Sequence, residues 1–317
     1  MRNWGLIIAI LAGVAGYFAY TEIPLFAGTH VVVNRIVNTA QPMLIFAMLL
    51  VTFCRIDPRH IHVRPWHWRL LAIQAGAFVL LGLTLIAVPQ LDYRVEIEGA
   101  MICMICPTAT AAAVITKKLG GDITAVISYT ILINITTAVL VPLMTPFVHP
   151  NPSMGIVNAM MQVSAKVFPL LLLPLVGALL LKRICPRVHA SLSANQELSF
   201  YLWLVALSLA IAVTVRSIVH STVPLSTELA LVAISAACCL LQFYAGNRIG
   251  RRYGDAISAQ QSLGQKNTVV AIWLGYTFFS PVTAVAGGFY SVWHNLVNQY
   301  QLYRQRHTAG HSHGSKC

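Results

Sequence analysis

Long apolar runs alternate with short polar segments along the whole chain. An α-helix needs about 20 mostly apolar residues to cross the hydrocarbon core of a bilayer, and most runs have about this length. The pattern predicts ten membrane-spanning helices, over residues 4–21, 36–54, 67–90, 97–118, 122–148, 156–182, 198–219, 226–247, 257–279 and 283–303. Two of these runs, 97–118 and 257–279, carry small and polar residues near the middle. We therefore predict an all-α polytopic membrane protein.

The composition agrees with this prediction. Hydrophobic residues make up 57% of the 317 residues and charged residues only 9%, whereas soluble domains carry about 25% charged residues. So few charges cannot cover a soluble globule, which excludes a soluble enzyme, a disordered chain and a coiled coil. The sequence contains no Walker-type loop and no hydrolase signature. We therefore expect neither an enzyme nor a protein with a cofactor or a bound metal.

The basic residues indicate how the chain is oriented. The net charge of +12 comes from 21 Lys and Arg against 9 Asp and Glu. With the N-terminus in the cytoplasm, most basic residues fall in cytoplasmic segments, as is typical of membrane proteins. We therefore predict that both termini are cytoplasmic. The last residues, 307–317, are polar and rich in His, and we expect them to form a disordered tail.

The chain divides near His149 into halves of five predicted spans each. An odd number of spans inverts the second half in the membrane, so halves that share a fold form an inverted repeat, the architecture of many secondary transporters. The fourth span of each half carries the polar interruption, over residues 106–111 and 262–268. Pro107 lacks a backbone N–H, and Gly264 weakens a helix. We therefore predict two broken helices at corresponding places, spans 4 and 9.

Broken helices in the middle of a membrane indicate a binding site. Unwound backbone is tolerated there only against protein or a watery cavity. The freed groups at half-helix ends attract an anion or hold a cation. A simple proline kink is the alternative for one break, but two breaks at corresponding places favour a site.

Lys266 lies about halfway along the ninth predicted span. A charge at this depth is costly and is by default a sign of function; the alternative is a side chain that reaches to the membrane surface. The acidic residues lie near span ends, so a carboxylate on the substrate could balance the lysine. In the tenth span, His294 and Asn295 are polar and mid-helix, and we assign them to binding rather than packing.

Three runs of residues resemble the bile acid:sodium symporter family. Its members carry runs similar to Cys-Pro-Gly-Gly-Thr-Ala-Ser-Asn in the fourth span, Glu-x-Gly-x-Gln-Asn in the ninth and Ser-Val-Trp-His-Asn in the tenth. The corresponding runs here are Cys-Pro-Thr-Ala-Thr-Ala-Ala-Ala (106–113), Ser-Leu-Gly-Gln-Lys-Asn (262–267) and Ser-Val-Trp-His-Asn (291–295). The resemblance implies a bacterial relative of the apical sodium-dependent bile acid transporter type, located in the inner (plasma) membrane.

The resemblance also implies two domains with a substrate cavity between them. A panel domain would comprise residues 1–66 and 151–222, and a core domain residues 67–150 and 223–306, with the broken helices crossing inside the core. The family transports organic anions by alternating access, so we expect a bile-acid-like, pantothenate-like or keto-acid substrate. Half-helix ends and short polar side chains converge beside the crossing, where we expect the substrate-binding residues Thr108, Thr110, Ala111, Asn267, Ser291, His294 and Asn295.

The sodium sites of the family are degenerate in this sequence. The positions that correspond to sodium ligands are Gln74, Ala112, Ala113, Val126, Thr130, Ser262 and Lys266, so no carboxylate and few side-chain oxygens remain. We therefore predict a sodium-independent transporter in which the ammonium of Lys266 replaces the sodium ions, with proton coupling left open. One alternative is a sodium-coupled symporter that uses backbone carbonyls as ligands. Another is a membrane receptor on the same fold that does not transport.

Overall fold

The computed structural model describes residues 5–22, 29–55 and 61–313, and this part of the chain is almost entirely helical, without a β-strand. The helices are α1 (Gly5–Glu22), α2 (His30–Phe53), α3 (Pro65–Ala87), α4 (Arg94–Ile105), α5 (Ala112–Lys118), α6 (Ile123–Val148), α7 (Ile156–Leu171), α8 (Leu173–Ile184), α9 (Pro186–Ala194), α10 (Gln196–Val219), α11 (Leu225–Arg251), α12 (Ala256–Gly264), α13 (Thr268–Phe278), the 3-10 helix η3 (Pro281–Thr283) and α14 (Ala284–His313). The all-α class predicted from the sequence is thereby confirmed.

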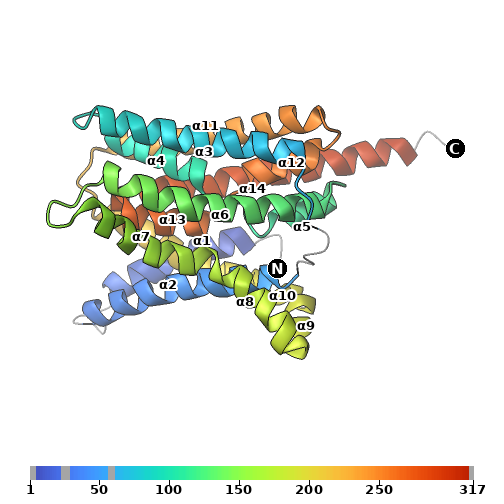
Figure 1. Ribbon diagram of the computed structural model, residues 1–317, viewed down its shortest axis with the longest axis horizontal. Helices are drawn as coiled ribbons and strands as arrows, with labels where there is room; N and C mark the ends of the chain where they lie inside the picture. Colours follow the sequence, from blue (N-terminus) through green and yellow to red (C-terminus); the bar gives the residue numbers. More distant parts are fainter. Residues whose placement is uncertain (1–4, 23–28, 56–60, 314–317) are drawn as a thin grey trace.

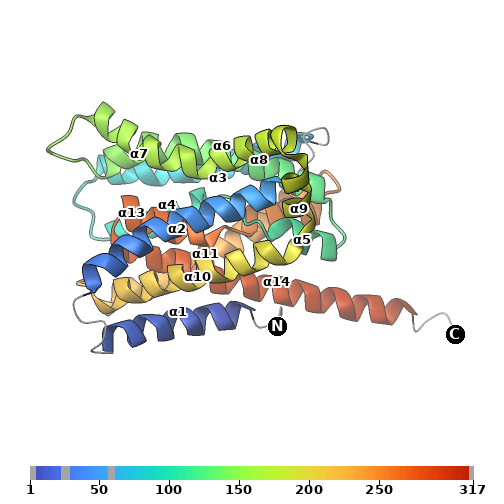
Figure 2. The same ribbon diagram turned by 90° about the horizontal axis from the view of Figure 1, so that it is seen from below.

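The long helices lie side by side and follow the long axis of the molecule (Figure 1). Helices α3, α4, α11 and α14 gather along one side of the bundle, and α1, α2, α8 and α10 along the other. Helix α10 packs against both α1 and α2, and α2 packs against α8. Figure 2 shows that α1 begins and α14 ends toward the same end of the bundle.

Fewer helices than predicted can cross a membrane by length and composition alone. Five qualify in the described part of the chain, namely those at Arg35–Phe53, Pro65–Ala87, Ile123–Val148, Phe200–Val219 and Leu225–Arg251, and α7 with α8 makes a sixth if they count as one span. Helix α1 is apolar but short, and the interrupted spans are divided into pieces below the required length. The protein therefore has several apolar helices consistent with a multi-pass membrane protein, while the count of ten stays a prediction.

Two predicted segments differ from the observed helices. The expected single helix over 156–182 consists of α7 and α8, which are bent by 41°. Pro174 lies in the first turn of α8, and because it lacks a backbone N–H and crowds the preceding turn, the helix cannot continue straight. Helix α14 continues through His313, into the stretch 307–317 that we expected to be disordered; residues 314–317 lie outside the described residues.

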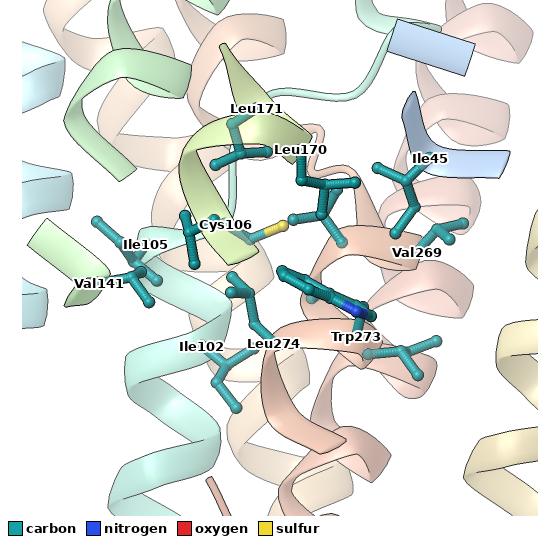
Figure 3. Packing of buried hydrophobic residues seen from close by; sticks show 14 of the residues in the cluster. Ile45, Ile102, Ile105, Cys106, Val141, Leu170, Leu171, Val269, Trp273 and Leu274 are labelled. Atoms are coloured by element: carbon teal, nitrogen blue, oxygen red, sulfur yellow. The ribbon is translucent and has the colours of Figure 1, made fainter. Parts of the chain in front are cut away.

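Buried apolar side chains fill the space between the helices around α4 and α13 (Figure 3). Ile102 of α4 lies beside Leu274 of α13 and Ile105 lies beside Val141 of α6, and side chains of α2 and α7 complete the cluster. Lipid tails are as apolar as these side chains, so close packing, rather than exclusion of water, holds such helices together.

Small residues let one half-helix approach its neighbour. Gly246 and Gly250 of α11 face α12, and a Cβ added at Gly246 would lie 2.7 Å from the carbonyl oxygen of Ala259. A Cβ at Gly250 would lie 2.7 Å from the Cβ of Ala259. This Gly-x-x-x-Gly spacing is typical of close helix contacts in membranes, and it fixes α12 against the long helix α11.

Candidate functional site

The two predicted breaks are in direct contact. Helix α4 ends at Ile105 and α5 begins at Ala112, while α12 ends at Gly264 and α13 begins at Thr268. The connecting segments run antiparallel: the N–H of Ala109 donates to the carbonyl of Gln265 (2.8 Å), and the N–H of Asn267 donates to the carbonyl of Pro107 (2.8 Å). These bonds form an isolated bridge between Thr108 and Lys266. We call this contact the crossing.

Local chemistry explains where each helix stops. The residue before a proline is disfavoured in the helical conformation, and Cys106 has φ −53° and ψ 132°, an extended backbone. At the second break, an added Cβ on Gly264 would lie 2.4 Å from the ring of Phe243 in α11. Gly264 is therefore required by this close contact, which adds a reason to the conformational freedom that the sequence suggested.

Side chains of other helices bind the carbonyls that the break in α4 leaves free. The donors are Gln242 to Cys103 (3.2 Å), Lys266 to Met104 (3.4 Å), Thr137 to Ile105 (2.9 Å) and Gln74 to Cys106 (2.9 Å). The last carbonyls of a helix have no partner within it, so these donors replace the missing helical hydrogen bonds. The hydroxyl of Tyr129 donates to Gln74 Oε1 (2.9 Å) and holds that side chain in place.

The end of α12 is satisfied in the same way. The hydroxyl of Thr108 donates to the carbonyl of Ser262 (2.6 Å), and the hydroxyl of Tyr290 donates to the carbonyl of Gly264 (2.8 Å). Gln242, which also binds α4, donates to the Tyr290 oxygen (3.1 Å). The two broken helices thus share one hydrogen-bond network, and much of their freed backbone already has a protein donor.

Lys266 is buried at the centre of the crossing, with a relative exposure of 1%. We expected its ammonium near the carbonyls of Cys106 and Ser262; it donates to Met104 instead, while Gln74 and Thr108 donate to the other two carbonyls. At 3.4 Å this is a long hydrogen bond. Among the described residues no carboxylate forms an ion pair with Lys266.

A small cavity of about 30 Å³ lies against the crossing. Five of the seven residues predicted to bind substrate line it: Thr110, Ala111, Asn267, His294 and Asn295. The other two, Thr108 and Ser291, are buried and do not line it. The sequence analysis missed Trp203 of α10, which also lines the cavity, because an aromatic residue in an apolar helix gives no sequence signal of binding.

Several buried polar atoms at the crossing have no hydrogen-bond partner in the described part of the chain. They are Ser262 Oγ, Gln265 Oε1, Asn267 Nδ2, Ser291 Oγ and His294 Nδ1. Folded proteins leave few such atoms, so a cluster of them indicates a place for a polar ligand or water. The Oδ1 atom of Asn267 accepts a long hydrogen bond from the Val270 N–H (3.5 Å) and caps the start of α13.

The positions corresponding to sodium ligands hold few available oxygens. Ala112 and Val126 are buried and apolar, and Ala113 is partly buried. The Thr130 hydroxyl donates to the carbonyl of Val126 (2.8 Å). The Ser262 hydroxyl is the side-chain oxygen at these positions that lacks a partner among the described residues. Residues 5–22, 29–55 and 61–313 also contain no group of three or more His, Cys, Asp or Glu that could hold a metal ion.

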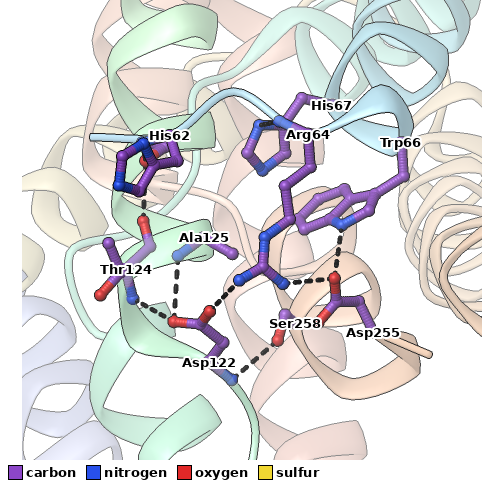
Figure 4. Close-up of polar contacts among 10 residues, drawn as sticks. His62, Arg64, Trp66, His67, Asp122, Thr124, Ala125, Asp255 and Ser258 are labelled. Carbon is purple, nitrogen blue, oxygen red and sulfur yellow. Dashed lines mark hydrogen bonds and ion pairs between the residues drawn. The ribbon is translucent and has the colours of Figure 1, made fainter. Parts of the chain in front are cut away.

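Charged residues connect the ends of the broken helices at one end of the bundle. Arg64, at the start of α3, forms ion pairs with Asp122, at the start of α6, and with Asp255, just before α12 (Figure 4). The hydrogen bond with Asp255 raises the pKa of the Arg64 guanidinium above its ordinary value. The Trp66 indole also donates to Asp255 (3.0 Å).

A second ionic cluster lies near the start of α4, at the end opposite to the break. Glu98 is buried, and its carboxylate lies 3.2 Å from Arg94 and 3.0 Å from His149, which follows α6. The N–H of Ser280, just after α13, donates to the same carboxylate (3.4 Å). Both halves of the crossing are therefore connected to ionic groups at their far ends.

No protein-family model matches the chain, and no curated protein is significantly similar to it in sequence. The resemblance to the bile acid:sodium symporter family therefore depends on the three short runs of residues. The function is argued below from the geometry of the crossing.

Proposed function

We propose that the protein is a secondary transporter of small organic anions that works by alternating access without bound sodium. In this proposal the chain has ten spans arranged as two inverted repeats, and it belongs to the bile acid:sodium symporter family. The substrate binds beside the crossing, and Lys266 replaces the cations of the relatives.

The contact between two interrupted helices carries this proposal. Interrupted helices that meet in a helix bundle are the usual substrate sites of secondary transporters. Here the interruptions lie at corresponding places in the two halves, and a cavity with unpartnered polar atoms lies beside them. A structural kink would leave neither the cavity nor the unpartnered atoms.

The electrostatics of the crossing favour an anion. Lys266 places a positive charge behind the cavity and has no carboxylate partner in the described part of the chain. Asn267 Nδ2 is a buried donor without an acceptor, and the positive end of α13 begins at the same place. A carboxylate on the substrate would supply both the missing charge and the missing acceptor.

The hydrogen bonds at the crossing support sodium independence. In transporters with broken helices, freed carbonyls coordinate the coupling ion. The carbonyls of Met104, Cys106, Ser262 and Gly264 already accept hydrogen bonds from side chains. A sodium ion would have to compete with these donors for the same oxygens, which weighs against the sodium-coupled alternative.

The arrangement of the bundle supports the two proposed domains. Helices α1, α10, α2 and α8 of the proposed panel pack in this order against one another, whereas α7, which the panel also includes, packs mainly against α6 of the proposed core. The cavity is lined from both groups, since Trp203 comes from α10 and the remaining residues from the crossing and α14. Alternating access requires the substrate to bind at an interface between two domains, as this cavity would allow.

Uptake into proteoliposomes tests the proposal. The purified protein is reconstituted, and uptake of labelled pyruvate and pantothenate is measured in sodium and in potassium buffers, with and without a pH gradient. We expect uptake that is equal in the two buffers. Strong stimulation by sodium would favour the sodium-coupled alternative, and binding without uptake would favour the receptor. Dependence on the pH gradient would identify proton coupling.

A further inference from the structure

Trp203 is the one residue lining the cavity that does not belong to the crossing or to α14. The remaining lining residues come from segments 109–111, 265–268 and 294–295. In the proposed transporter, on which this inference depends, Trp203 is therefore the contribution of the panel domain. In that transporter the panel domain moves relative to the crossing, and Trp203 faces the crossing from the panel domain.

An aromatic partner and a close helix contact fix the position of the indole ring. The rings of Phe200 and Trp203, one turn apart on α10, have centroids 5.9 Å apart and an interplanar angle of 35°. A Cβ added at Gly5 of α1 would lie 2.8 Å from the Phe200 ring and 3.6 Å from the Trp203 ring. Helix α1 thus packs directly behind the aromatic pair, and the indole has little room to withdraw from the cavity.

The cavity that Trp203 helps to line is small. About 30 Å³ is room for roughly two water molecules, whereas pockets that enclose a drug-sized ligand measure about 300–1,000 Å³. A carboxylate group fits beside Asn267 and His294, but a bulky body attached to it would meet the indole ring. Trp203 also makes no side-chain hydrogen bond with the described residues, so its N–H remains available as a donor to an anion.

We propose that Trp203 determines substrate specificity by limiting the transported anion to small carboxylates. The crossing binds the carboxylate, and the indole ring contacts the short body of the same molecule. Bile-acid-sized anions are excluded because the ring occupies the space that a steroid body needs. The residue is a specificity determinant and has no role in holding the crossing together.

A size series of carboxylates tests this inference. Uptake of labelled pyruvate, benzoate and cholate is measured for the wild type, Trp203→Ala, Trp203→Phe and the control Trp68→Ala. Trp68 lies on α3 and is 58% exposed on the outside of the bundle. We expect the wild type and Trp68→Ala to take up pyruvate, to take up benzoate less well and to exclude cholate. Trp203→Ala should raise KM for pyruvate about tenfold, as expected for the loss of one aromatic contact at a binding site, and should admit cholate.

The control variants separate specificity from folding. Trp203→Phe retains a ring and should keep the size limit, and gel filtration in detergent shows whether each variant is folded. If Trp203→Ala does not fold, Trp203→Leu still tests the size limit, because its aliphatic side chain lacks the ring and should admit larger anions. Wild-type uptake of cholate at the rate of pyruvate, or an unchanged size limit in folded Trp203→Ala or Trp203→Leu, would refute the role of Trp203 while leaving the proposed transport intact. Absence of uptake of all three anions by the wild type would refute both.

Discussion

Replacing Lys266 with Met separates the charge of this residue from its volume. Methionine has nearly the length of lysine and fills the same space without an ammonium. Lys266 is buried at 1% exposure, and the hydrogen bond from its ammonium to the carbonyl of Met104 is 3.4 Å long. A buried charge is stable only when its surroundings compensate for the lost hydration, and one long hydrogen bond compensates poorly. We therefore expect Lys266→Met to fold at least as stably as the wild type.

The magnitude follows from two opposing terms. Replacing buried ionic groups by apolar ones of similar volume often stabilises a protein by about 1–4 kcal/mol. Leaving the carbonyl of Met104 without a donor costs about 1–3 kcal/mol, and the lower end applies because the lost bond is long. The net change is a stabilisation of about 1–2 kcal/mol, which corresponds to a rise in Tm of a few degrees. Lys266→Ala should instead lower stability by about 2–5 kcal/mol, because it leaves a cavity.

Thermal unfolding in detergent and uptake into proteoliposomes check this prediction together. We expect Lys266→Met to have a Tm equal to or above that of the wild type and to have lost anion uptake, since the positive charge behind the cavity is gone. Lys166→Met is the matched control, because Lys166 is exposed and lies over the ring of Phe278 rather than at the crossing; it should keep wild-type uptake. Normal uptake by Lys266→Met, or a Tm as low as that of Lys266→Ala, would refute the reasoning.

Further predictions concern the surroundings of the crossing and the orientation of the chain. Arg64→Ala removes two ion pairs whose side chains are about a third exposed or less, so the free energy of unfolding should fall by only about 1 kcal/mol, and by less at high salt; a loss that does not depend on salt would contradict an ionic role. Glu98→Gln leaves Arg94 without its carboxylate and should lower the free energy of unfolding by about 1–3 kcal/mol in the same assay. An unchanged free energy of unfolding would show that the ion pair between Arg94 and Glu98 does not form. Gln74→Leu removes a donor to the freed carbonyls of α4 and should also cost about 1–3 kcal/mol, and an unchanged Tm would show that water replaces it. A cysteine in place of Ile61, in a background without reactive native cysteines, should react with an impermeant maleimide only in inverted membranes, and labelling in intact cells would reverse the predicted orientation.

The crossing was largely predictable from the sequence because local chemistry causes both breaks. Pro107 cannot continue a helix wherever it is placed, and the polar run around Lys266 interrupts an otherwise apolar span. Five residues expected at the site line one cavity in the structure. Their roles in binding stay predictions, but their proximity was implied by the positions of the breaks.

The number of spans and the helix bend were less predictable. Apolar length indicates a helix but does not say whether it is straight, and Pro174 divides the run 156–182 into α7 and α8. Broken spans are also too short to qualify individually as membrane helices. Whether two short helices together form one span depends on how they are arranged in space, which is a tertiary property.

The sequence by itself determined that this protein is helical and apolar, where two of its helices break and which lysine lies between them. These properties depend on residues within one or two helical turns of each other. The tertiary structure alone decided that Gln242 and Tyr290 bind the freed carbonyls, that Lys266 donates to Met104 and that Trp203 lines the cavity. Such contacts join residues far apart in the chain, and their geometry depends on how whole helices pack, which no local pattern specifies.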